Sequence, residues 1–209
     1  MTLYWKRNPE LIFLATLVLC AAVLIGRNIR ERNSGSRSGD AAAPVVFSSA
    51  SVIARLQERI RQNPDAAGAY SGLGVALLQR VRETGDPLLY AQAEAALNEA
   101  LKRDANDFDA LLGQGALALS RHQFRDALEW GERARTLNPY SAQPYGVIGD
   151  AQVELGDYEA AATSIQAMVD TRPDLSSYSR VSYQRELHGD IPGAVIACLL
   201  YTSPSPRDS

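Results

Sequence analysis

Hydrophobic and polar positions divide the chain into three stretches with different patterns. From Leu11 to Gly26 the sequence LIFLATLVLCAAVLIG is apolar throughout and carries no charge. From Asn33 to Ser51 the residues are mostly small or polar, and Pro44 interrupts them. After Ser51, apolar residues recur at spacings of three and four, the period of amphipathic helices. The pattern predicts an apolar helix, then a flexible tether, then a helical domain.

The apolar run predicts an uncleaved transmembrane helix over residues 11–26. Each Leu, Ile, Phe or Val favours insertion by about 0.3–0.6 kcal/mol near a helix centre. Sixteen residues cover about 24 Å, less than a hydrocarbon core of about 30 Å. Tyr4 and Trp5 on one side and Arg27 and Arg30 on the other can anchor the ends and cover the shortfall. We therefore expect a single-pass membrane protein held by this helix.

Two alternatives in which the apolar segment is cleaved, and the orientation of the segment in the membrane, stay open at this point. A secreted form would have its mature amino terminus near Ala43, far beyond the apolar core. A lipoprotein signal around Cys20 would need a small residue where Leu19 stands. More basic residues follow the segment than precede it, so the positive-inside rule places the rest of the chain in the cytoplasm. The two basic residues before it, Lys6 and Arg7, also suit export of the carboxyl side.

Charge and side-chain chemistry argue against several function classes. The net charge is −3, with acids and bases interspersed, so nucleic acid is not expected as a partner. The two cysteines, Cys20 and Cys198, and the two histidines, His122 and His188, are isolated from one another, which predicts neither a disulfide framework nor a metal site. No nucleophile elbow or phosphate loop occurs. We expect no catalytic residues, no cofactor and no small-molecule substrate.

A period of 34 residues organises the helical region, and such a period is typical of repeat arrays. Six pairs share this spacing: Leu111 and Tyr145, Gly115 and Gly149, Phe124 and Tyr158, Ala127 and Ala161, Ala134 and Met168, Pro139 and Pro173. One period earlier, Tyr90, Ala93 and Ala100 are in register. The first half of that unit is displaced by seven residues, which identifies RETGDPL (Arg82–Leu88) as an insertion.

The composition of the unit predicts a pair of closely packed helices. Gly115 and Ala127, like Gly149 and Ala161 in the next unit, are small residues that let two antiparallel helices approach. In the turn LGDY, Gly156 ends one helix and Asp157 caps the next. A proline then ends each second helix, because proline cannot continue one.

These residues resemble the tetratricopeptide repeat over about Ser51–Ala197. The third unit matches the motif best, at these positions: Tyr145, Ile148, Gly149, Gly156, Tyr158, Ala161, Ile165 and Pro173. The middle unit departs at Gln114 and Gly131, and the last at Ser179 and Ser182. The resemblance implies an all-α solenoid of helix hairpins, a right-handed superhelix whose concave side, formed by first helices, binds a protein or peptide.

The resemblance also implies which side chains face a partner. Nine positions are expected on the concave face, although some equally suit packing between units: Ser71, Val75, Leu78, Leu112, Ala116, Leu119, Gly146, Asp150 and Val153. The three corresponding stretches, AAGAYSGLGVALLQ, FDALLGQGALALS and AQPYGVIGDAQVEL, contain no Lys or Arg, and the third carries Asp150 and Glu154. Gripping a carboxylate needs charge-assisted donors. We therefore do not expect docking of a chaperone's acidic tail, and we expect an apolar or weakly basic ligand.

The final twelve residues, 198–209, break the pattern. The letters CLLYTSPSPRD match a translation of a sequencing-library adapter over eleven residues, which favours a non-native tail over a Ser-Pro recognition motif. The predicted organisation is a tail (1–10), a transmembrane helix (11–26), a linker (27–50), a repeat domain (51–197) and this segment. The function hypothesis is a membrane-tethered interaction scaffold. The alternative is the substrate-recruiting part of a larger enzyme or sensor.

Overall fold

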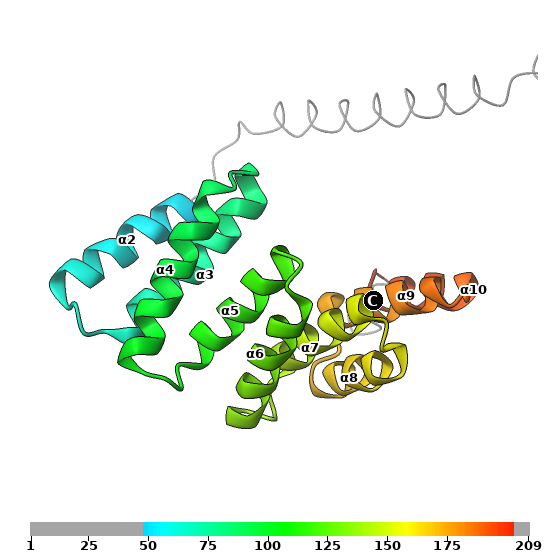
Figure 1. The fold of residues 1–209 in the computed structure, drawn as a ribbon. Helices are drawn as coiled ribbons and strands as arrows, with labels where there is room; N and C mark the ends of the chain where they lie inside the picture. Colours follow the sequence, from blue (N-terminus) through cyan, green and yellow to red (C-terminus); the bar gives the residue numbers. More distant parts are fainter. Residues whose placement is uncertain (1–47, 203–209) are drawn as a thin grey trace, which may run out of the picture. The chain divides into compact units, whose positions relative to one another are not determined.

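The computed structural model describes residues 48–202, and these residues form helices joined by short turns (Figure 1). The described residues belong to one compact unit. The predicted tail, transmembrane helix and most of the linker lie outside the described residues, as do residues 203–209. Within 48–202 there are nine helices and no strand, which confirms the predicted all-helical fold.

One leading helix and four helix hairpins follow one another along the described chain. The bounds are α2 (Ser49–Gln62), α3 (Ala67–Thr84), α4 (Leu88–Arg103), α5 (Phe108–Ser120), α6 (Phe124–Leu137), α7 (Ala142–Leu155), α8 (Tyr158–Thr171), α9 (Leu175–Leu187) and α10 (Ile191–Thr202). The two helices of each hairpin pack together, and α5 also contacts α3 and α7. The helices thus stack as the 34-residue period predicts.

The helix ends confirm the predicted turn chemistry. Gly156 follows α7 in the left-handed conformation, with φ of 81°, which a residue without a side chain adopts without strain. Asp157 then caps α8, because its carboxylate accepts a hydrogen bond from the Ala160 amide. Pro139 and Pro173 each stand two residues beyond the end of a helix. The insertion Arg82–Leu88 is divided between the end of a long α3, the turn at residues 85–87 and the first residue of α4.

The core of the first hairpin depends on one leucine held between two glycines. Leu97 on α4 is fully buried. A Cβ placed on Gly74 of α3 would lie 2.5 Å from the Leu97 Cγ, and one on Gly113 of α5 would lie 2.5 Å from its Cδ2. No real Cβ tolerates such a contact, so both glycines make room for the same side chain. Leu97 therefore joins its own hairpin to the next one.

The two departures of the middle unit from the repeat pattern have a packing explanation. Gly131 stands where a larger residue is usual, and the next unit fills the space: a Cβ on Gly131 would lie 2.8 Å from the Ile148 Cγ1. Gln114 is buried, and its Nε2 donates a 2.7 Å hydrogen bond to the Asn98 Oδ1. Because buried polar groups need partners, Asn98 makes a glutamine acceptable there.

The predicted single-pass membrane localisation, with its cytoplasmic orientation, is contradicted. Among residues 48–202, no helix is both long and apolar enough to cross a membrane. The longest, α3, has 18 residues and includes Arg80, Arg82 and Glu83. The segment that suggested the prediction, 11–26, lies outside the described part of the chain. At the other end, α10 continues through Thr202, so the boundary predicted after Ala197 falls inside a helix.

Candidate functional site

The first helices of successive units present one continuous face. On α5, Leu112, Ala116 and Leu119 follow one another at spacings of four and three, which places them on one side of a helix. On α7 the equivalent stripe is Gln143, Val147, Asp150 and Glu154. These stripes line two cavities in turn, one beside the amino-terminal halves of α5 and α7 and one beside their carboxyl-terminal halves.

The larger cavity, called the groove below, has a volume of about 570 Å³. Its lining comes from α2, α3, α5 and α7 and is mainly apolar: Val52, Gly72, Val75, Ala76, Leu78, Gln79, Arg82, Asp109, Leu112, Gly113, Ala116, Gln143 and Val147. Four of the nine predicted partner-facing residues belong to it: Val75, Leu78, Leu112 and Ala116. Of these, Val75 is 41% exposed, an apolar side chain with much of its surface in water.

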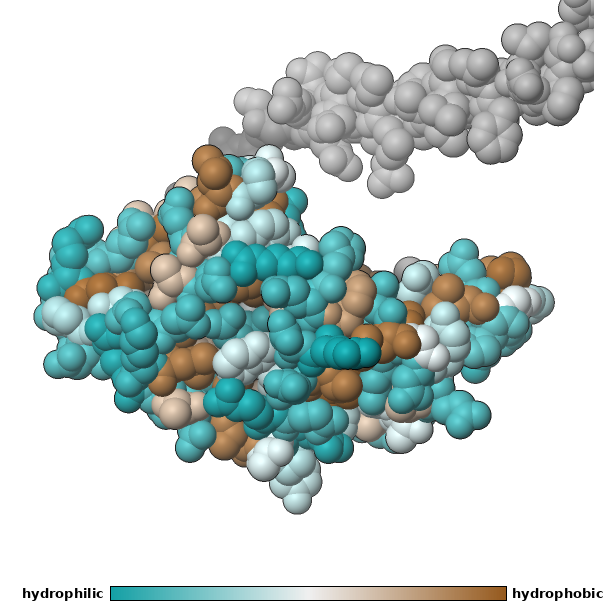
Figure 2. Space-filling view, viewed as in Figure 1, coloured by the Kyte–Doolittle hydropathy of each residue, from teal (hydrophilic) through white to brown (hydrophobic). Residues whose placement is uncertain are grey.

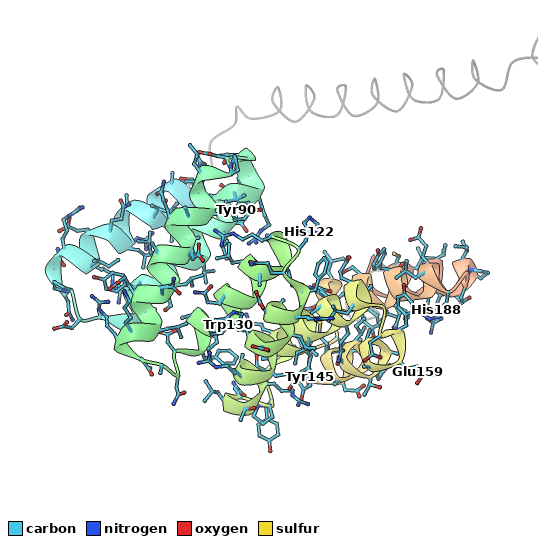
Figure 3. The ribbon with its side chains drawn as sticks, viewed as in Figure 1. Tyr90, His122, Trp130, Tyr145, Glu159 and His188 are labelled. Carbon is cyan, nitrogen blue, oxygen red and sulfur yellow. The ribbon has the colours of Figure 1, made fainter. Side chains whose placement is uncertain are left out.

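A second cavity of about 320 Å³ follows the groove and is more polar in character. It is lined by Leu119, His122, Phe124, Asp150, Val153, Glu154, Ile165, Arg180 and Tyr183. Three predicted positions, Leu119, Asp150 and Val153, are among them. His122, which the sequence suggested was an isolated surface residue, lies in the turn between α5 and α6 (Figure 3). Its backbone is left-handed, with φ of 59°, and its ring meets Phe124 edge-on.

The two remaining predicted positions line neither cavity. Ser71 is 1% exposed and is packed inside the array. Gly146 is buried too, and a Cβ there would lie within 3.5 Å of Met168 on α8 and of Arg180 on α9. Both serve contacts between helices, the second role that the sequence allowed for this set. The face available to a partner is therefore narrower than the repeat pattern suggests.

An ion pair that sequence reasoning missed crosses the second cavity. The Arg180 guanidinium on α9 donates from Nε to the Asp150 Oδ1 at 2.7 Å and from NH2 to Oδ2 at 2.6 Å. Another Arg180 nitrogen donates to the carbonyl and hydroxyl oxygens of Ser176. Asp150 is thus neutralised by a residue of the next unit. The two residues are 30 apart in sequence, and α9 matches the repeat pattern poorly, so no sequence signal pairs them.

The groove has few polar side chains, and its charged residues are one base, Arg82, and one acid, Asp109. Arg82 donates hydrogen bonds to the Gln79 side chain, 3.1 Å from Nε and 2.7 Å from NH2. Asp109 lies in the first turn of α5, where a carboxylate suits the helix dipole. Within the described ranges, no group of His, Cys, Asp and Glu residues could hold a metal ion.

The carboxyl groups with displaced pKa values belong to α2, α3 and α4. On α4, hydrogen bonds from Arg103 and then Lys102 lower the pKa of Glu99 to about 2. The Ser49 hydroxyl, at the start of α2, donates to Glu83 on α3 and is the main cause of a lowered Glu83 pKa. On α2, Arg61 and then Gln62 lower the pKa of Glu58. None of these three carboxylates lines the groove or the second cavity.

Comparisons with known proteins agree with this geometry. The family model of the tetratricopeptide repeat matches residues 89–142, from α4 to the start of α7. No curated protein matches the chain. Residues 89–142 are therefore similar to the tetratricopeptide repeat, in agreement with the hairpin stacking described above.

Solved structures of other proteins share the fold. MamA 41-end from Desulfovibrio magneticus RS-1 has 22% identity and a TM-score of 0.56, covering 82% of this chain and 88% of its own. TTC0263, a thermophilic tetratricopeptide protein of Thermus thermophilus, has 14% identity and a TM-score of 0.65, covering 77% and 86%. YrrB has 18% identity and a TM-score of 0.52, covering 74% and 78%. At these identities the likeness concerns the fold.

Proposed function

We propose that this chain is a non-catalytic protein-interaction module whose groove binds an extended peptide, or the apolar face of a helix, from a partner protein. The observation that carries the proposal is the groove itself, a cavity of about 570 Å³ with a mainly apolar lining from α2, α3, α5 and α7. Volumes of this size are typical of ligand-binding clefts. The family match over residues 89–142 supports the same role.

Val75 gives the proposal an energetic basis. It is an apolar residue, 41% exposed, in a cavity whose other walls are largely apolar. Burying a side chain of this size completely is worth about 1.5–3 kcal/mol, and a partner that covers Val75 gains the exposed part of this. Leu112 and Ala116 on the facing helix are both half-buried and add to the apolar surface. A partner with two or three apolar side chains in succession suits this lining.

The charges near the groove favour a partner without an acidic tail. The basic side chain of the second cavity, Arg180, is already bound to Asp150 and Ser176. Arg82 at the groove is engaged by Gln79. Neither guanidinium is arranged to hold a free carboxylate, so we expect no carboxylate clamp. YrrB, whose fold is similar, is described as having an unusual peptide-binding site, and this precedent on the same fold supports a peptide as the ligand.

The test is a selection of random twelve-residue peptides displayed on phage against the full 209-residue chain. Peptides with neighbouring apolar residues should be enriched, and Leu112→Glu should weaken their binding at least tenfold, because it places a charge in the apolar lining. Leu137→Glu is the matched control, since Leu137 lies on α6 outside the groove and is 42% exposed. If no peptide is enriched, or if both variants weaken binding equally, the groove is not the binding site.

A further inference from the structure

We propose that the second cavity is a subsite for a lysine or arginine side chain of the same bound peptide, about three residues away from the apolar residues that fill the groove. This inference rests on the proposed peptide-binding function and names the ligand chemistry more closely. Its basis is an unpaired carboxylate, Glu154, in a cavity walled by aromatic and aliphatic side chains.

The two cavities follow one another along the same helix faces. On α7, Val147 lines the groove, and Asp150 and Glu154 line the second cavity. Residues 147 and 154 are seven apart, which is about 10 Å along a helix axis. An extended peptide advances about 3.3 Å per residue. A side chain that reaches Glu154 therefore belongs to a residue roughly three positions from the one that contacts Val147.

Glu154 carries a negative charge that no basic residue of its own helix balances. It lies in the last turn of α7, which carries no basic residue, and the helix dipole disfavours a negative charge at that end. Glu154 is exposed, and the ion pairs found among residues 48–202 do not include it. A carboxylate placed against the helix dipole and left without a counter-ion is suited to a cation supplied by a ligand.

The other charges of the cavity leave it negative. Asp150 and Arg180 neutralise each other through two short hydrogen bonds. The remaining acidic side chain of the lining is Glu154. A peptide side chain entering the cavity thus meets one uncompensated negative charge. Because a like charge there would be repelled, an acidic peptide residue is excluded and a basic one is favoured.

The walls suit the shape and chemistry of a long basic side chain. Leu119, Val153 and Ile165 provide aliphatic surface against which the methylene stem of a lysine or arginine can pack. Phe124 and Tyr183 add aromatic rings, whose faces attract cations. The cavity combines an apolar path for the stem with a carboxylate for its charged end. A short neutral side chain would use neither.

The experiment uses peptides from the selection described above, resynthesised with a fluorescent label in three forms. The residue three positions from the apolar pair is lysine, glutamine or glutamate, on either side of the pair. We expect the lysine form to bind the full chain about three- to fivefold more tightly than the glutamine form, as for a partly exposed ion pair. The glutamate form should bind more weakly than both.

Two variants identify the responsible carboxylate. Glu154→Gln should abolish the lysine preference, and Glu154→Lys should transfer it to the glutamate form. Glu159→Gln is the control, because Glu159 is an exposed carboxylate in the first turn of α8 that lines neither cavity. Unchanged thermal melting of each variant shows that the fold is retained.

The outcomes separate the two proposals. Peptides that bind and depend on Leu112, with no lysine preference or with a preference that survives Glu154→Gln, overturn the subsite and leave the groove intact. The absence of any groove-dependent peptide contradicts the interaction function itself, and the subsite with it. A lysine preference lost only in the Glu154 variants supports both.

Discussion

The first and last hairpins of the array are both rich in apolar residues, yet they bury them very differently. In α3 and α4, Leu97 is fully buried between Gly74 and Gly113, and the second glycine belongs to the next unit. In α10, Ile191, Val195 and Ile196 are each more than half exposed. Figure 2 shows hydrophobic side chains at the surface over this end of the array.

The difference lies in the neighbours rather than in the helices. The α3–α4 hairpin contacts α2 on one side and α5 on the other, whereas the α9–α10 hairpin contacts α8 and, through Arg180, α7, which both precede it in the described chain. In solenoids, burial comes from stacking each unit between two others. The comparison teaches that apolar content in such a chain predicts a helix face that needs a neighbour, and the neighbour decides whether the face is buried.

The largest expected effect is the loss of Leu97. Leu97→Ala leaves a cavity that two glycines cannot fill, so we expect a loss of about 3–5 kcal/mol in the free energy of unfolding. Ile196→Ala removes a side chain that is 56% exposed and should change it by less than about 1 kcal/mol. Urea denaturation followed by circular dichroism measures both. Equal losses in the free energy of unfolding at the two positions would contradict the difference in burial between the first and last hairpins.

Adding a methyl group to Gly74, against which Leu97 packs, also tests whether the first hairpin is closely packed. In Gly74→Ala the new methyl group meets the Leu97 side chain at 2.5 Å, and overpacking of this kind costs about 1–3 kcal/mol. Gly68→Ala, on the same helix, meets no atom within 4 Å and should be neutral or slightly stabilising, because alanine has the higher helix propensity. The melting temperature of Gly74→Ala should therefore fall, and that of Gly68→Ala should stay the same or rise slightly. A stable Gly74→Ala protein would show that the hairpins do not pack closely.

A smaller effect is expected where the last hairpin joins the array. Asp150→Asn removes the charge that binds Arg180 between α7 and α9, and we expect a loss of about 1 kcal/mol in the free energy of unfolding, since both side chains are partly exposed. Glu132→Gln breaks an exposed pair with Arg135 inside α6 and should have less effect. Chemical denaturation of both variants compares them. A larger loss from Glu132→Gln would mean that Arg180 contributes little to holding α9.

The smallest effect concerns Glu99 on α4, which is held by charged side chains rather than packed in the core as Leu97 is. The Arg103 and Lys102 side chains lower the pKa of Glu99 from 4.5 to about 2. The stabilisation from this pairing is complete above pH about 4.5 and is lost as the pH falls through about 2. Carbon-detected NMR titration of the Glu99 carboxyl should give this low value. A value near 4.5 would show that solvent screens the exposed cluster fully.

Much of the fold follows from the sequence, because it depends on local rules. Gly156 and Asp157 specify a turn through backbone and capping chemistry, and the 34-residue spacing specifies hairpins. The contacts between units do not follow in the same way. Three such contacts depend on how neighbouring helices and units are placed on one another. They are the packing of Ile148 against Gly131, the hydrogen bond from Gln114 to Asn98, and the ion pair between Asp150 and Arg180.

The candidate site shows the same division between local and long-range information. Helical spacing groups Leu112, Ala116 and Leu119 on one side of α5, and seven of the nine predicted positions line the groove or the second cavity. Ser71 and Gly146 are buried because neighbouring helices cover them, which spacing within one helix does not report. The predicted membrane localisation failed for a different reason, since it came from a segment outside the repeats.

Photo-crosslinking at two positions of equal exposure tests the central claim, that the groove is the partner-binding face. A photoreactive phenylalanine analogue replaces Val75, 41% exposed in the groove, or Leu137, 42% exposed on α6 outside it. With a peptide selected on the full chain, the analogue at position 75 should crosslink efficiently and the one at 137 should not. Equal crosslinking at both positions, or crosslinking at 137 alone, would contradict the account.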